Sequence, residues 1–84
     1  MIFKVYILWS ETLQKFYVGS TNELKDRLYR HNSGQGKFTR KGVPWKLVYS
    51  FGCIDRKEAL KLEMKIKKRG IKRFLVDLNI EFGK

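Results

Sequence analysis

The chain has few of the residues that build cross-links or metal cages. Its 84 residues include one cysteine, one histidine and one proline. The single cysteine, Cys53, excludes an internal disulfide, and its apolar surroundings predict a small core residue. One cysteine and one histidine also argue against a zinc site made of those ligands. No paired carboxylates such as D-x-D stand in a predicted pocket, which argues against a two-metal nuclease.

Long apolar runs are absent as well. No stretch approaches the ~18 residues that a membrane-spanning helix requires. The apolar run Val5–Trp9 is too short for a secretory signal and follows Lys4. The basic segments lack the broad apolar face of a membrane-surface helix. We therefore expect a cytoplasmic, nucleoid-associated protein with no membrane partner.

Acidic residues are scarce beside basic ones, 8 against 19, and the formal net charge is +11. Such an excess predicts an anionic partner: nucleic acid, an anionic membrane or an acidic protein. The basic residues cluster, because residues 22–46 hold seven basic and two acidic residues and residues 55–73 hold nine and three. Clustering favours a binding surface, with a solvated helix face as the alternative. No linker or repeat interrupts the chain, so one domain over 1–84, with a core of about 3–78, is predicted.

Alternating apolar residues predict three strands. Residues 2–9 and 15–19 read as a hairpin around a polar turn, and residues 45–54 as a third strand. Tyr6 and Tyr17 fall on the same face of this hairpin and come close if the register allows it. In the third strand, period two predicts one shared face for four residues: Trp45, Leu47, Tyr49 and Phe51.

Three helices are predicted from the remaining segments. One spans about 22–32 and carries Leu24 and Leu28 as its apolar stripe. Its N-cap candidates are Ser20, Thr21 and Asn22. The second begins at a capping box made of Asp55 and Glu58 and ends near residue 69. The third spans residues 71–78. The order ββαβαα gives an α+β fold, a small three-stranded antiparallel sheet packed with about three helices.

 Glu63 falls inside the broad apolar arc of the second helix, which is formed by Ala59, Leu60, Leu62, Met64 and Ile66. Lys67 stands four residues after Glu63 and falls inside the same arc. One interpretation is an ordinary surface ion pair worth about 0.3–0.5 kcal/mol. The other is a carboxylate at the edge of the core that holds a divalent metal.

Arg27 and His31 are neighbours on one side of the first helix, four residues apart. Taken singly, Arg27 reads as a solvated charge, His31 as a structural residue, and Tyr6 and Tyr17 as half-buried strand tyrosines. Phosphodiester hydrolysis, however, needs a deprotonated water, a charge partner for the phosphate and help for the leaving oxygen. Together with Glu63, these residues supply the groups that such a reaction requires.

The same residues carry a family resemblance. Val5-Tyr6-Ile7, a nine-residue spacer and Tyr17-Val18-Gly19 resemble the paired motifs of the GIY-YIG nucleases. The segments that follow are similar to the first helix, the middle segment and the metal-carboxylate helix of small stand-alone bacterial members: Thr21–Asn32, Phe38–Tyr49 and Glu58–Lys68. The chain departs from excision-repair relatives in having Ser20 where a lysine is usual and Leu75 where an asparagine is usual.

The resemblance implies a role for each site residue. Glu63 would hold one Mg²⁺ or Mn²⁺, and Arg27 would bind the scissile phosphate. Tyr6, Tyr17 and His31 would position or deprotonate the attacking water, and the identity of the base stays open among them.

The predicted function is a metal-dependent endonuclease that hydrolyses phosphodiester bonds in DNA, directed by branched or single-stranded structure rather than by sequence, in repair or recombination. The alternatives are a non-catalytic nucleic-acid-binding module and a nuclease subunit that needs a protein partner. Phe38 reads either as a stacking platform for an unpaired base or as a loop anchor. The basic residues expected to contact the DNA backbone are Lys37, Arg40, Lys41, Lys67, Lys68, Arg69, Lys72 and Arg73.

Overall fold

The computed structural model describes residues 2–80, so both ends of the predicted 1–84 domain lie outside the described residues. The elements follow one another as β1 (Phe3–Ser10), β2 (Lys15–Thr21), α1 (Leu24–Asn32), a 3₁₀ turn η1 (Arg40–Gly42), β3 (Trp45–Cys53), α2 (Arg56–Arg69) and α3 (Ile71–Asp77). The predicted order ββαβαα and the α+β class are confirmed.

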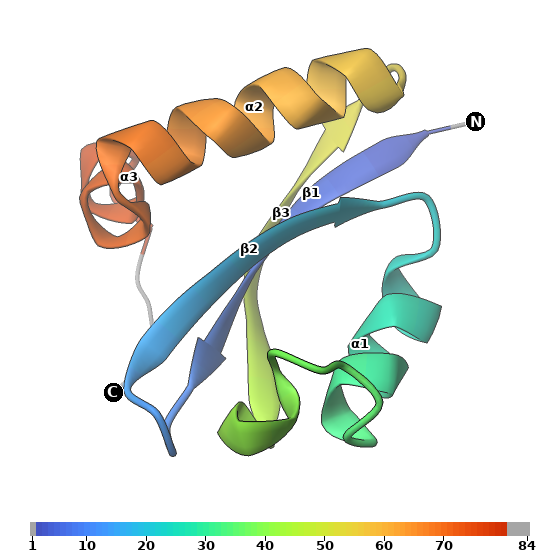
Figure 1. Ribbon diagram of the computed structural model, residues 1–84. Helices are drawn as coiled ribbons and strands as arrows, with labels where there is room; N and C mark the ends of the chain where they lie inside the picture. The colour runs from blue at the N-terminus through green and yellow to red at the C-terminus, as the bar shows by residue number, and fades with distance from the viewer. Residues whose placement is uncertain (1, 81–84) are drawn as a thin grey trace.

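The sheet is antiparallel with the strand order β2-β1-β3, which makes β1 the central strand. Its register with β2 pairs Tyr6 with Gly19 and Leu8 with Tyr17. Tyr6 and Tyr17 therefore share a face, as predicted. Figure 1 shows α2 running across one side of the sheet with α3 at its end, while α1 lies on the other side.

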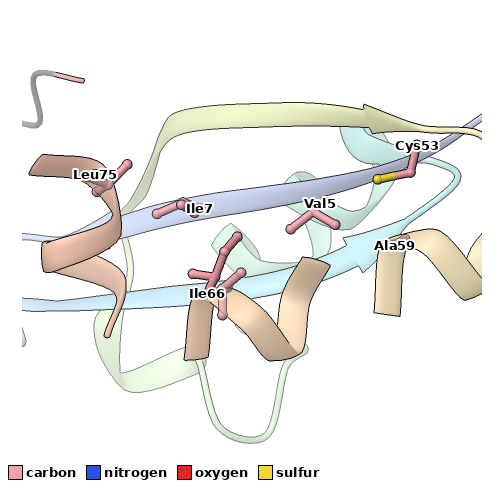
Figure 2. Packing of buried hydrophobic residues seen from close by; sticks show 7 residues of the cluster. Val5, Ile7, Cys53, Ala59, Ile66 and Leu75 are labelled. Carbon is pink, nitrogen blue, oxygen red and sulfur yellow. The ribbon is translucent and has the colours of Figure 1, made fainter. Parts of the chain in front are cut away.

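The main hydrophobic core fills the space between the sheet and the α2–α3 pair. Val5 and Ile7 from β1 pack with Ala59, Ile66 and Leu75 from the helices, all fully buried (Figure 2). Burying a large aliphatic side chain of this kind contributes about 1.5–3 kcal/mol. The thiol of Cys53 belongs to the same cluster, which confirms the prediction of a small core residue.

A second, smaller cluster covers the opposite face of the sheet. Tyr6, Leu8 and Trp45 are buried there, with Leu24 and Leu28 of α1 packed against them. The apolar stripe predicted for the first helix is therefore the surface that docks α1. This face carries tyrosine, tryptophan and histidine side chains, whereas the buried residues of the α2–α3 face are aliphatic apart from Cys53.

The shared face predicted for the third strand is wrong. The register of β3 opposite β1 shifts between Ile7 and Leu8, because Tyr49 pairs with Ile7 while Leu47 pairs with Leu8. The residue between them, Val48, is the extra residue of a β-bulge. Trp45 and Leu47 consequently lie on the α1 face, and Tyr49 and Phe51 lie on the α2–α3 face.

Two helix details also differ from the predictions. The first helix begins at Leu24, not at 22, and the Thr21 hydroxyl accepts a hydrogen bond from the Glu23 amide at 3.0 Å. The apolar arc of α2 is narrower than predicted, since Leu60 and Met64 are exposed. The capping box is confirmed: the Asp55 carboxylate accepts from the Glu58 amide at 2.9 Å, and the Glu58 carboxylate accepts from the Ile54 amide at 2.8 Å.

Asn32, the last residue of α1, joins this helix to the start of β3. Its side-chain carbonyl accepts from the amide of Trp45, and its side-chain NH₂ donates to the Trp45 carbonyl at 3.0 Å. The side chain thus acts as an additional strand residue beside Trp45. This contact fixes the end of α1 that carries His31.

We expect Asn32→Ala to lower the free energy of unfolding by about 1–3 kcal/mol, because the partly buried backbone groups of Trp45 lose both partners. Urea unfolding measures the change. Ser33→Ala is the matched control, because the Ser33 hydroxyl makes an exposed hydrogen bond within α1. Equal stability of the two variants would show that the Asn32 contact does not anchor α1.

Candidate active site

Tyr6 lies at the centre of the candidate site, on β1, with 1% of its surface exposed. Its phenol passes directly over Gly19 of the neighbouring strand. A Cβ atom at position 19 would lie 2.7 Å from the Tyr6 hydroxyl oxygen and 2.9 Å from Cζ. Both separations are too short for any side chain, so glycine at this position is what allows the phenol to reach across β2.

The hydroxyl of Tyr6 is hydrogen-bonded to Nε2 of His31 at 3.0 Å. The imidazole is 6% exposed, and its other nitrogen, Nδ1, is hydrogen-bonded to the Thr39 hydroxyl at 2.8 Å. The three side chains form a continuous chain from β1 through α1 to the loop before η1. In a neutral imidazole one nitrogen donates and the other accepts, so the hydroxyl of Thr39 and the phenol of Tyr6 are coupled through the tautomer of His31.

Tyr17 packs against this chain from β2. Its ring centroid is 5.1 Å from that of His31, in an edge contact, and 6.3 Å from that of Tyr6. Trp45 supports the other side of the Tyr17 ring at 6.1 Å. Tyr17 is less buried than Tyr6, so its phenol is the more accessible of the two.

Arg27 stands one helical turn before His31, and its charge acts on both Tyr6 and His31. Burial raises the pKa of Tyr6 from 10.0 to about 12, assisted by Tyr17, while the charge of Arg27 and its hydrogen bond to the phenol act in the opposite direction. Burial also lowers the pKa of His31, and the Arg27 charge lowers it further. At neutral pH both Tyr6 and His31 are therefore uncharged, and His31 is free to accept a proton.

Glu63 approaches the site from α2, on the opposite side of the sheet. Its side chain is 16% exposed and forms an ion pair with Lys67, with 3.0 Å between Lys67 Nζ and Glu63 Oε2. The charge of Glu63 is one of the causes that raise the pKa of Tyr6, which places the carboxylate within electrostatic reach of the phenol. The ion pair that was one of the two interpretations of Glu63 is present, and its carboxylate also influences Tyr6 electrostatically.

The single, largely buried carboxylate of Glu63 suits Mg²⁺ or Mn²⁺ better than a metal that needs several protein ligands. Mg²⁺ keeps several of its waters and commonly binds through one or two carboxylates and the substrate phosphate. Within residues 2–80, no group of three or more histidine, cysteine or acidic side chains could enclose an ion. The side chain of Lys67 is 59% exposed, so it can turn to solvent and leave Glu63 to a metal.

A cavity of about 290 Å³ opens beside Arg27, where β2, α1 and the first turn of α2 meet. Arg56 reaches this cavity from α2. The sequence did not single out Arg56, because an arginine in a lysine-rich helix has no distinguishing local pattern. The residues that line the cavity are Phe3, Ser20, Thr21, Asn22, Arg27 and Arg56.

Thr39 is the second site residue that sequence reasoning missed. Its segment was noticed only as part of the family resemblance, although a threonine close to a lone histidine offers a hydroxyl partner for the imidazole. A Cβ at Gly36 would overlap the Thr39 hydroxyl and lie 3.4 Å from His31 Nδ1. Gly36 therefore leaves the space in which Thr39 and His31 meet.

The predicted DNA-contacting residues are divided between the two faces of the sheet. Lys37, Arg40 and Lys41 lie on the loop and on η1, beside α1. The others lie on α2 and α3, namely Lys67, Lys68, Arg69, Lys72 and Arg73. Arg69 makes a two-point ion pair with Asp77, with distances of 2.8 and 3.0 Å. Because α1 and α2 lie on opposite sides of the sheet (Figure 1), a nucleic acid that touches both groups lies across an edge of the sheet.

We expect Thr39→Val to destabilise the fold by about 1–3 kcal/mol, because His31 Nδ1 stays buried without its hydrogen-bond partner. Thr39→Ser keeps the hydroxyl and loses a single methyl group, at a cost of about 0.8 kcal/mol. Thermal and urea unfolding of the two variants compare these effects. A valine variant as stable as the serine variant would mean that the hydroxyl contributes nothing.

The raised pKa of Tyr6 predicts a loss of stability in alkali. The folded protein holds the phenolic proton more tightly than the unfolded chain, so this contribution is complete below pH 10 and disappears as the pH rises towards 12. Two pKa units correspond to about 2.7 kcal/mol. The unfolding free energy should fall more steeply across this range for the wild type than for Tyr6→Phe. Parallel pH profiles would contradict the assignment.

Comparison with known proteins agrees with this geometry. The GIY-YIG catalytic domain model matches residues 3–73. A UPF0213 protein of Streptococcus pneumoniae is 40% identical over 55 residues, which are 64% of this chain and 56% of that protein, so the match spans little more than half of the relative. The UPF0213 protein in the ldhD 5′ region of Pediococcus acidilactici is 41% identical over 76 residues, 87% of this chain and 76% of the relative.

A solved structure gives the same result for the fold. The solution NMR structure of a UPF0213 protein from Bacillus halodurans superposes with a TM-score of 0.58 at 33% identity, covering 93% of this chain and 85% of that one. In the part of the chain that the structure describes, no helix is long and apolar enough to cross a membrane. The family model covers most of the sequence and the motif tyrosines meet in one cluster, so the chain belongs to the GIY-YIG nuclease family.

Proposed function

We propose that the chain is a divalent-metal-dependent endonuclease that hydrolyses phosphodiester bonds in DNA. The observation that carries the proposal is the buried Tyr6–His31 hydrogen bond beside Arg27, with the Glu63 charge in reach. Buried polar groups cost free energy unless all their hydrogen-bond partners are present. An apolar core would stabilise the fold at least as well, so stability alone does not explain this cluster. Its arrangement matches the needs of phosphate ester hydrolysis.

Each residue has a distinct task in this proposal. Arg27 offers a planar fork that binds phosphate oxygens in two places. Glu63 would hold a divalent ion, which would supply positive charge for the phosphate and the leaving oxygen. Neutral His31 receives a proton at Nε2 from the Tyr6 hydroxyl as that hydroxyl takes one from the attacking water. Tyr17, the more accessible phenol, orients the water.

The proton path explains how a tyrosine with a raised pKa can serve at neutral pH. A phenol whose pKa is about 12 is a poor acid on its own, and a free phenolate would be too scarce. Passing the proton on to His31 in the same step avoids the phenolate. The hydroxyl of Thr39, at 2.8 Å from Nδ1, then accepts from the imidazolium and stabilises the added charge.

The substrate is proposed to be recognised by its structure. Phe38 is 89% exposed on the basic loop, which argues against the loop-anchor interpretation and supports stacking on an unpaired base. The basic side chains contact backbone phosphates without reading sequence. Single-stranded or branched DNA of the kind met in repair and recombination fits both properties, and a protein partner would select among such substrates.

A non-catalytic nucleic-acid-binding module is the second candidate. The Glu63–Lys67 ion pair favours it, because that pair already neutralises the carboxylate that a metal would need. The two candidates differ in what they predict for Glu63. A nuclease requires its charge, whereas a binding module with a net charge of +11 does not.

We expect Glu63→Gln to lower the rate of Mg²⁺- or Mn²⁺-dependent cleavage by about 100-fold or more, since a glutamine is a weak ligand for either ion. Binding of the same DNA should be unchanged. Cleavage of single-stranded, duplex and branched DNA, with Glu11→Gln as the charge-matched control in an exposed turn, gives the measurement. Full cutting by Glu63→Gln would refute the site. Binding without cutting by the wild type would favour the binding module.

A further inference from the structure

The cavity beside Arg27 is not explained by the chemistry of the cleaved bond. Its volume of about 290 Å³ lies at the lower limit of small-molecule pockets, which span about 300–1,000 Å³. Phe3 forms its apolar wall and is held in place by the α2–α3 core. The rest of the lining is polar, from Ser20, Thr21 and Asn22 at the end of β2.

Two guanidinium groups reach this cavity from different helices. Arg27 comes from α1 and Arg56 from the first turn of α2. No carboxylate lines the cavity, and neither arginine belongs to an ion pair among the residues that the structure describes. By contrast, Arg30 and Arg69 are each paired with an aspartate. The cavity therefore concentrates positive charge that nothing within it balances.

Such a lining selects one class of ligand. Two adjacent guanidinium groups repel a metal cation and attract an anion that can accept several hydrogen bonds, which describes a phosphate group. The hydroxyl of Thr21 accepts from the Glu23 amide, so its own proton is available to an oxyanion. Ser20 adds a second hydroxyl to the lining, which can donate to an oxyanion.

The place of Arg56 on α2 separates its ligand from the reacting phosphate. Arg56 and Glu63 are seven residues apart, which puts them on the same side of the helix and about 10 Å apart along its axis. A group bound at Arg56 is therefore displaced from the Glu63 carboxylate along the direction of α2. Arg27 lines the cavity and is also hydrogen-bonded to Tyr6, so it connects the cavity with the Tyr6–His31 pair.

We propose that this cavity binds a second backbone phosphate of the nucleic acid, next to the one that is cleaved, and that Arg56 is the residue that holds it. The ligand follows from the proposed function, in which the substrate is a nucleic-acid strand. The contact fixes the direction of the strand across the site. It also provides a reason for the basic residue at the start of α2, where a positive charge is unfavourable to the helix dipole.

We expect Arg56→Gln to weaken binding of a fluorescently labelled single-stranded oligothymidylate by about 10- to 100-fold, the loss typical of a charge-assisted hydrogen bond. The dependence of log affinity on log salt should become shallower by about 0.7. Lys57→Gln is the matched control, because it removes the same charge at the next residue, which is exposed and outside the cavity. Its effect should stay below about threefold, the scale of a single surface charge.

Fluorescence anisotropy in the presence of EDTA provides the affinities, so the result does not depend on cleavage. Equal weakening by both variants would overturn the proposal, because it would reduce the role of Arg56 to net charge. In addition, the backbone amide NMR signals of Ser20 and Thr21 should shift when wild type binds the strand. Unchanged signals would place the phosphate elsewhere. A protein that never cuts DNA can still pass this test, and an active nuclease can fail it.

Discussion

The close contact between the Tyr6 phenol and the backbone of Gly19 is the constraint on which the site depends. Because no side chain occupies position 19, the phenol crosses over β2 and meets Nε2 of His31. That hydrogen bond ties α1 to the central strand and sets the distance between Arg27 and the sheet. The glycine of the second motif is thus required by packing, and its effect on chemistry comes through the tyrosine of the first motif.

The electrostatics of the cluster are decided by burial more than by charge. Arg27 alone would make Tyr6 a stronger acid, yet desolvation is the largest cause and the pKa rises to about 12. The same burial lowers the pKa of His31, so the pair is held neutral at physiological pH. A neutral pair can transfer a proton internally without first creating a buried charge, which would cost several kcal/mol in such surroundings.

Local patterns in the sequence were sufficient for the order of the elements and for the neighbours within the candidate site. Period two placed Tyr6 and Tyr17 on one face, helical spacing placed Arg27 beside His31, and the capping box at Asp55 formed as predicted. The sequence did not predict the bulge at Val48. One extra residue leaves the alternation of apolar residues intact but reverses the face of the sheet on which the later residues of β3 lie. No local rule detects such a shift in pairing.

The site residues that were missed depend on contacts between distant segments. Thr39 is hydrogen-bonded to His31 from across a loop, and Arg56 lines the same cavity as Arg27 from a different helix, 29 residues later in the chain. Helical and strand periodicities relate residues within one element and say nothing about which elements touch. The family resemblance supplied the positions of the motif residues, yet Arg56 lies outside those motifs and became visible only as part of a cavity wall.

The division of basic residues between the two faces of the sheet limits the form of a bound nucleic acid. A nucleic acid that contacts the loop bearing Lys37 and also the α2–α3 side lies across an edge of the sheet (Figure 1), in a domain whose extents are 30 × 27 × 18 Å. Duplex DNA has a persistence length of about 150 base pairs, and bending it sharply over a short site costs about 1–6 kcal/mol. A single strand or a junction turns at far lower cost. This difference in cost and the exposed Phe38 ring both support the proposal that the substrate is flexible or branched DNA.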